Sequence, residues 1–223
     1  MIIEDCIYAI VAFSKSAISK LPENTDLTSE LRSGINGTCF FVKPDEFVTA
    51  HHVFNSESFA DNLYVIINSK GEIIQDIDFM GENPEMDLSM GKLINSKTSY
   101  ISDFNSVYID KSYTAYGFSR KDTVGIKLRA IKKNGKLSIL KSDKIHLKTI
   151  KYKCIAVKAV SNFKASEDIT LTCDIIIFNE DTEVGFSGGP TLDSEGKIIG
   201  FTSSSVILPD GKEVNSVIPI SYK

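Results

Sequence analysis

Gly185-Phe186-Ser187-Gly188-Gly189-Pro190 is the stretch of the 223-residue sequence that decides the fold. A serine acts as a nucleophile only when its hydroxyl is exposed, lies near a base and has hydrogen-bond donors beside it for the oxyanion that forms. A glycine two residues before the serine allows the backbone to turn its N–H inward, so Gly185 and Ser187 are the candidate donors of an oxyanion hole. The following glycines carry no Cβ and allow a substrate backbone to approach closely. A simple glycine-rich turn is the alternative interpretation.

The same letters fit G-x-S-x-G, the nucleophile elbow of α/β-hydrolases, in which a helix follows the serine. Here Pro190 leads instead through a Ser194-Glu195-Gly196 turn into the strand-like segment Lys197–Phe201. In those enzymes the histidine also comes after the serine, whereas all three histidines of this chain, at 51, 52 and 146, precede Ser187. The order of the residues therefore excludes the elbow.

Short segments rich in Val, Ile, Thr, Tyr and Phe recur along the chain, broken by Gly, Asn, Asp and Ser, as is typical of antiparallel strands. The predicted strands are Cys6–Phe13, Thr38–Val42, Phe47–Thr49, Leu63–Asn68, Thr123–Lys132, Lys136–Leu140, Lys148–Val160, Ile169–Phe178, Lys197–Ser203 and Ser216–Ile220. Asn134-Gly135 predicts a tight hairpin turn, and helix signals are weak. An all-β sandwich, one large barrel or two small barrels would fit this pattern.

A second block, Phe47–Phe54, is a strand that ends in Thr-Ala and turns into His-Val. Together with Gly37–Val42, Asp87–Leu93, Gly185–Phe201 and Asn215–Pro219, it resembles the trypsin-like serine peptidases, specifically their HtrA-like branch. These blocks occur in the same order as in that family, between roughly residues 5 and 220, although the segments between them match nothing specific.

The resemblance implies two antiparallel six-stranded β-barrels, about 1–102 and 103–223, with the active site in the cleft between them. It implies a catalytic triad in which His52 is the base of Ser187 and Asp87 fixes the imidazole tautomer. His52 takes the catalytic place when the block is aligned on Thr49-Ala50, and His51 takes the variable place before it. The competitors of Asp87 for the carboxylate role are Asp76, Asp78 and Asp103.

Substrate-binding residues follow from the same resemblance. Asp181 lies six residues before Ser187, where an acid would select Lys or Arg at the P1 position, although a generally acidic run is the other interpretation. Ser203-Ser204-Ser205 resembles the strand edge that pairs with the substrate backbone. Phe186 replaces the aspartate with which secreted zymogens pair a newly released amino terminus, so that route of activation is excluded. HtrA-like relatives usually carry a PDZ domain, so regulation from a partner or from a longer chain is expected.

The net charge of −4 is unevenly distributed. Residues 120–158 hold thirteen of the 25 Lys and Arg but only two acidic residues. We expect a solvated barrel face there, with lysines alternating outward, and the alternative is a docking surface for an acidic protein or nucleic acid. Tyr152 is the one aromatic residue in this stretch, which does not suggest a stacking platform for single strands.

The four cysteines, at 6, 39, 154 and 173, show no close spacing, which favours free thiols in a reducing compartment and a cytoplasmic protein. No apolar run is long enough for a membrane helix. No metal-ligand spacing or phosphate loop is present, so we expect neither a metal nor a cofactor.

The sequence therefore predicts a serine endopeptidase that hydrolyses protein or peptide substrates through an acyl-enzyme. One alternative is a catalytically silent pseudoprotease that serves as a binding or sensor module. Another is an effector protease switched on by a partner or a fused sensor domain.

Overall fold

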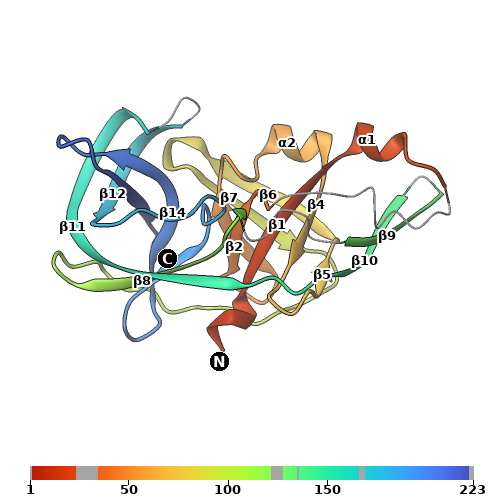
Figure 1. Cartoon of the computed structure of the whole chain (residues 1–223), viewed down its shortest axis with the longest axis horizontal. Helices are drawn as coiled ribbons and strands as arrows, with labels where there is room; N and C mark the ends of the chain where they lie inside the picture. Colours follow the sequence, from red (N-terminus) through yellow and green to blue (C-terminus); the bar gives the residue numbers. More distant parts are fainter. Residues whose placement is uncertain (1, 24–34, 122–127, 135, 166–168, 221–223) are drawn as a thin grey trace.

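The computed structural model describes residues 2–23, 35–121, 128–134, 136–165 and 169–220 of the chain. Two antiparallel β systems lie side by side, one built from the N-terminal half and one from the C-terminal half (Figure 1). Among the described residues no helix is long and apolar enough to cross a membrane. The four cysteines are free thiols, as the sequence predicts.

The N-terminal half forms a seven-stranded sheet in the order β5-β4-β1-β2-β3-β7-β6. Phe40, Phe41 and Phe47 are fully buried, and because Phe40 and Phe41 are consecutive in β2, both faces of this strand are covered. The rings of Phe41 and Phe47 meet edge to face at 5.7 Å. The strands are β1 (Ile7–Ser14), β2 (Gly37–Phe41), β3 (Glu46–Ala50), β4 (Asn62–Ile67), β5 (Ile73–Ile74), β6 (Ile77–Asn83) and β7 (Leu88–Leu93).

The C-terminal half forms a closed six-stranded barrel in the order β11-β12-β15-β14-β13-β8. Burial alternates along β8, whereas β13, β14 and β15 are buried at consecutive positions. Tyr152 and Phe178 are buried, with ring centroids 4.0 Å apart. The strands are β8 (Ser112–Phe118), β11 (Leu147–Lys164), β12 (Thr170–Phe178), β13 (Pro190–Leu192), β14 (Ile198–Ile207) and β15 (Glu213–Pro219). The predicted all-β, two-barrel fold class is confirmed, although the first half carries seven strands instead of six.

A hairpin of β9 (Leu128–Lys133) and β10 (Lys136–Ser142) departs from the predicted layout. It is a separate two-stranded sheet that leaves the closed barrel and lies at the far side of the N-terminal half, next to β5 (Figure 1). The side-chain amide of Gln75 donates to the carbonyl of Ile139 at 2.7 Å and accepts from its N–H at 3.0 Å. Asn134, at φ +52°, begins the predicted turn, while Gly135 lies outside the described residues.

The basic stretch 120–158 is therefore not one solvated barrel face. Lys132 lies on the buried side of the hairpin, where its Nζ donates to the carbonyls of Ser19 and Leu21 at 2.9 and 2.7 Å. Lys148 and Lys153 instead form ion pairs with Glu183 and Asp110. Residues 122–127 of the stretch lie outside the described part of the chain, so the predicted docking of an acidic partner or nucleic acid stays a prediction.

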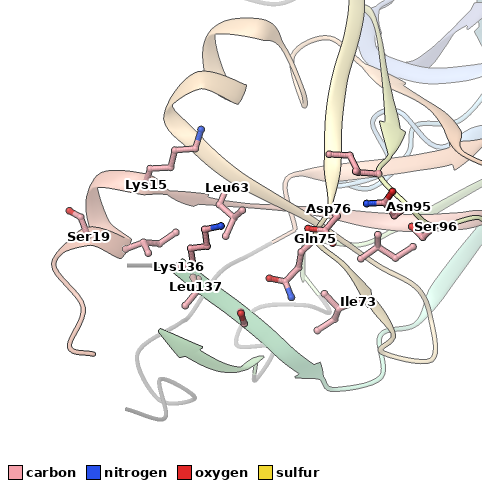
Figure 2. A pocket seen from close by; sticks show the side chains of 14 residues that line it. Lys15, Ser19, Leu63, Ile73, Gln75, Asp76, Asn95, Ser96, Lys136 and Leu137 are labelled. Carbon is pink, nitrogen blue, oxygen red and sulfur yellow. The ribbon is translucent and has the colours of Figure 1, made fainter. Parts of the chain in front are cut away.

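Figure 2 shows a cavity of about 730 Å³ between this hairpin, β5 and helix α1 (Lys15–Ser19). Its lining includes the apolar side chains of Leu63, Ile73 and Leu137 and the charged side chains of Lys136 and Asp76. None of the residues predicted for the active site lines it. The hairpin thus shapes a surface that is separate from the region described next.

Candidate active site

His52 is presented by a tight turn at the end of β3. The N–H groups of Val53 and Phe54 both donate to the carbonyl of Ala50, at 3.1 and 3.2 Å, which turns the chain sharply after the strand. The next helix, α2 (Ser56–Asp61), begins at an Asn55 cap whose side chain accepts from the Ser58 N–H at 2.8 Å. The strand, the turn and the capped helix therefore fix where the imidazole lies.

Asp87 is the most strongly held polar side chain of the region. It ends a short 3-10 helix (Pro84–Met86) in the left-handed conformation, at φ +47°, and only 1% of its surface is exposed. Oδ1 accepts from the backbone N–H of His52 at 3.0 Å, and Oδ2 accepts from the hydroxyl of Ser203 at 2.6 Å. Both carboxylate oxygens also lie 3.0 Å from Nδ1 of His52.

This contact sets the tautomer of His52. A carboxylate only accepts hydrogen bonds, so Nδ1 carries the proton, and Nε2 of the neutral ring keeps its lone pair. The His52 side chain is 28% exposed, compared with 1% for Asp87. Nδ1 of the ring therefore faces the buried carboxylate, whereas Nε2 keeps a lone pair that solvent or a neighbouring group can reach.

The neighbouring His51 points to a different partner. Its backbone N–H donates to the Asp87 carbonyl at 2.8 Å, while its Nδ1 lies 3.3 Å from Oε2 of Glu82 without the angle of a hydrogen bond. Burial alone would raise the pKa of Glu82. Hydrogen bonds from the N–H and hydroxyl of Ser56, together with the charge of His51, outweigh it and lower that pKa. The two adjacent imidazoles therefore face different carboxylates, His52 that of Asp87 and His51 that of Glu82.

The loop that carries Ser187 packs on the end of β3, two residues before His52. An added Cβ at Gly188 would lie 2.2 Å from the Thr49 hydroxyl and 2.7 Å from the Ala50 nitrogen, so the backbone of the loop touches that strand directly. The Ser187 carbonyl accepts from the Thr38 N–H at 2.8 Å. From the C-terminal barrel, Gly188 N–H donates to the Thr202 carbonyl at 2.7 Å. Both halves of the fold therefore hold the serine loop.

Within Gly185–Gly189, the backbone N–H groups of Gly185 and Ser187 have no acceptor in the described part of the chain. The carbonyl of each of these two peptides is held on the opposite side. Val184 accepts from Arg120 N–H at 2.7 Å, and Phe186 accepts from Gly189 N–H at 2.8 Å. Because N–H and C=O point in opposite directions in a trans peptide, these bonds fix where both free N–H groups point.

Phe186 anchors the loop in the core of the closed barrel. Its side chain is fully buried in a cluster with Tyr113, Tyr152 and Phe178. The ring lies so close to Gly117 that a Cβ there would be 2.5 Å from its Cγ. At this position, where secreted zymogens have an aspartate, the side chain is therefore held by apolar packing.

The predicted substrate-binding residues, Asp181 and Ser203–Ser205, are all engaged in hydrogen bonds within the protein. The Asp181 carboxylate accepts from the Ser205 hydroxyl at 2.9 Å, so these two lie together. The Ser203 hydroxyl binds Asp87 and is buried, so only its backbone is left for a substrate. The Ser204 carbonyl accepts from the Ser216 hydroxyl at 2.6 Å. Substrate binding by these residues stays a prediction.

A cavity of about 610 Å³ opens beside His52 and Asp87. Its other walls are the 3-10 helix with Glu85 and the end of the long β11–β12 hairpin, with Asn162 and Thr170. The sequence does not predict this hairpin wall, because the strand predicted to end at Val160 is β11, which runs to Lys164. The side chain of Thr38 is likewise not predicted, since a threonine in a buried strand gives no signal of where its hydroxyl points.

Within the described residues, no three His, Cys, Asp or Glu side chains are grouped to hold a metal ion. The chemistry available here is that of the imidazole, the carboxylate, the serine loop and the two unpaired amides.

The sequence and the fold of the chain are similar to those of known proteins. A family model described as a trypsin-like peptidase domain matches residues 37–201, which is well over half of the chain. No curated protein sequence matches. Solved structures share the fold at low identity, so they support the fold alone.

The active form of the Rv3671c protease from M. tuberculosis superposes with a TM-score of 0.65 at 14% identity, covering 97% of this chain and 77% of its own. The apo protease domain of MamO from Magnetospirillum magneticum gives 0.63 at 12%, covering 97% and 93%. The HtrA-type protease AlgW with a tripeptide gives 0.62 at 14%, covering 97% and 56%.

Proposed function

Because the chain belongs to the trypsin-like peptidase domain family, we propose that it is a serine endopeptidase with Ser187 as nucleophile, His52 as base and Asp87 as the carboxylate. The observation that carries the proposal is the His52–Asp87 pair, with both carboxylate oxygens 3.0 Å from Nδ1. That pair lies at the end of β3, on which the serine loop packs. The three roles that acyl transfer requires thus have residues of the right chemistry in one region.

The proposed reaction uses the free lone pair of His52 Nε2. In the first half, Nε2 takes the Ser187 proton as Oγ attacks the scissile carbonyl, and Asp87 stabilises the imidazolium. His52 then gives the proton to the leaving amine, and an acyl-enzyme remains. In the second half, His52 activates a water that releases the acid and restores the Ser187 hydroxyl.

The N–H groups of Gly185 and Ser187 are proposed to bind the negative oxygen of each tetrahedral intermediate. Their support is that neither has an acceptor in the described part of the protein, and that the carbonyls of both peptides are held away by Arg120 and Gly189. Such donors cost no reorganisation during the reaction, which is why they contribute strongly to catalysis.

The proposed substrate is an extended peptide segment of a protein. Strand β13 pairs with β14 only from Ile198 to Phe201, so it does not cover the part of β14 that holds Ser203–Ser205. An extended chain added there would gain backbone hydrogen bonds, with specificity left to side-chain pockets. Asp181, held by Ser205, is the proposed determinant of the P1 residue.

The test is labelling with a fluorophosphonate together with cleavage of a peptide library. Wild-type protein is expected to react with the probe and to cut peptides, whereas Ser187→Ala and His52→Ala do neither. His51→Ala is the matched control, since His51 faces Glu82. An active Ser187→Ala variant would disprove the nucleophile, and a folded wild type that neither labels nor cleaves would favour a pseudoprotease.

A further inference from the structure

We propose that the hydroxyl of Thr38, a residue of the N-terminal half, is a positioning group that holds the oxyanion loop of the C-terminal half in its working shape. The inference rests on the proposed function and concerns a residue for which the sequence predicts no role. Thr38 is fully buried in β2, so its hydrogen bonds must be made within the protein.

Every polar atom of Thr38 is engaged at the junction between the two halves. The hydroxyl donates to the Gly185 carbonyl at 2.7 Å and accepts from the Phe118 N–H at 3.1 Å. The backbone N–H donates to the Ser187 carbonyl at 2.8 Å, and the backbone carbonyl accepts from the Thr49 hydroxyl at 2.7 Å. One residue therefore binds both the glycine and the serine that carry the proposed oxyanion donors.

The bond to the Gly185 carbonyl has a specific geometric effect. It fixes the peptide that follows Gly185, just as the Arg120 N–H fixes the peptide before it through the Val184 carbonyl. With both flanking peptides held, Gly185 keeps φ at +106° and its N–H has one direction. Without the hydroxyl, the carbonyl side of that peptide loses its partner, and the peptide is held only by the Phe186 N–H bond to the Glu183 carbonyl, at 3.1 Å.

The hydroxyl also joins the loop to β8. Phe118 N–H and the Gly185 carbonyl both meet the same oxygen, so the hydroxyl bridges a strand and a loop that would otherwise face each other with unpaired polar groups. A buried donor and a buried acceptor left without partners favour a rearranged backbone that satisfies them elsewhere. That rearrangement would move the Gly185 amide away from the oxyanion.

Thr38→Val tests the proposal, because valine keeps the shape of threonine and removes the hydroxyl. We expect kcat to fall about 10- to 100-fold, less than or equal to the loss from deleting a direct oxyanion donor. KM for the same peptide is expected to stay within about two-fold, since ground-state binding does not use the oxyanion hole. The affinity for a peptidyl boronate, which mimics the tetrahedral state, should fall in parallel with kcat.

Thr38→Ser, which restores the hydroxyl, is expected to recover most of kcat and of the boronate affinity. Thr191→Val is the matched control: Thr191 is also fully buried, and among the residues that the structure describes its hydroxyl bonds only to the Tyr152 hydroxyl, at 3.0 Å. It should lose a similar amount of stability and keep kcat within about two-fold. If Thr38→Val fails to fold, Thr38→Ala assayed at a lower temperature gives the same comparison.

Retention of full kcat and boronate affinity by a folded Thr38→Val protein would overturn the positioning role. An equal loss of kcat in Thr191→Val would also overturn it, because the effect would then be general destabilisation. Failure of the proposed function is distinguishable from both, since then the wild type itself would show no hydrolysis sensitive to Ser187→Ala.

Discussion

Gly185 combines two constraints that no other residue type meets. Its φ of +106° lies in the region that favours glycine, and an added Cβ would lie 2.3 Å from the Phe118 carbonyl and 2.9 Å from the Arg120 nitrogen. We expect Gly185→Ala to displace the proposed oxyanion donor and lower kcat about 100-fold or more. Steady-state hydrolysis of a peptide amide measures this.

Gly211→Ala is the control for backbone strain alone, because Gly211 has φ +84° but nothing lies within 4 Å of its added Cβ. It should lose some stability and no activity. Wild-type kcat in Gly185→Ala would show that the loop does not supply the donor.

The thiol of Cys173 offers a prediction for pH. Burial, followed by the negative charges of Asp174 and Asp87, raises its pKa to about 11. The thiolate is the reactive form, and at pH 8 only about one Cys173 thiol in a thousand is ionised, so the labelling rate should rise about tenfold per pH unit up to pH 10. Iodoacetamide labelling followed by peptide mass spectrometry measures it. Equal rates in native and urea-unfolded protein would contradict the expectation.

At the residue level, the sequence could predict which residues have the chemistry of a peptidase site, but not where each side chain points. His52, Asp87 and Ser187 could be predicted because the trypsin-like pattern has those residue types in that order, and their roles stay a prediction. The hydroxyl directions of Thr38 and Ser203 depend on which strand crosses nearby, and residues far apart in the chain supply their partners. Ser203 shows the limit, since its predicted contact was substrate and its side chain holds Asp87.

Among the elements, the β9–β10 hairpin depends on one buried cation. The Lys132 side chain is 6% exposed, and its two bonds go to carbonyls of Ser19 and Leu21 at the end of α1. Lys132→Met keeps the apolar stem and leaves both carbonyls without this donor. We expect the free energy of unfolding in urea to fall by about 2–3 kcal/mol.

Lys133→Met is the companion variant, because Lys133 is the exposed neighbour on the same strand. Its unfolding free energy should change by less than about 0.5 kcal/mol. Equal stabilities of the two variants would mean that the hairpin does not depend on this contact.

The β11–β12 hairpin and the 3-10 helix lead to a prediction about substrates. Glu85 lines the cavity beside His52, and in the described part of the chain no cation pairs with it. Peptides with Lys or Arg at the position that enters this cavity should be cut roughly two- to five-fold faster than those with Gln. Glu85→Lys should reverse the preference in a positional library, and an unchanged ranking would exclude Glu85 from specificity.

Elements with a clear apolar pattern were predictable, and those without one were not. β6 is missing from the predictions because it is largely exposed and contains Asp, Gly, Glu and Asn. β8 alternates correctly, yet its apolar positions include Ala115 and Gly117, which are too small to give a strong signal. The docking of β9–β10 could not be read from the sequence, because Gln75 and Ile139 lie 64 positions apart.

Across the whole molecule, the two halves share interior surface. One hydrophobic cluster contains Phe41 and Ile66 of the first half with Ala130 and Ile198 of the second. We therefore expect one cooperative unfolding transition, with coincident curves from tyrosine fluorescence and circular dichroism. A fragment of residues 103–223, cut at the predicted boundary, should not fold alone; a folded fragment would show that the halves are independent.

The family match and the order of the site residues made the overall arrangement predictable, whereas the division into 1–102 and 103–223 stays a prediction. That boundary follows the order of the chain. The contacts of Gln75, Lys132 and Thr38 instead join residues that are far apart in the chain, and each contact connects one half to the other.

Phe186 holds the serine loop by apolar packing, whereas secreted zymogens with an aspartate at this position use an ion pair with the released amino terminus. Dispersion and burial hardly change with dissolved ions, whereas an exposed ion pair weakens as salt screens it. The conformation of the serine loop should therefore not change with ionic strength. The stability of the loop also depends on Gly117, because the Phe186 ring fills the space that a side chain at position 117 would need. A larger residue at 117 would therefore require a smaller one at 186.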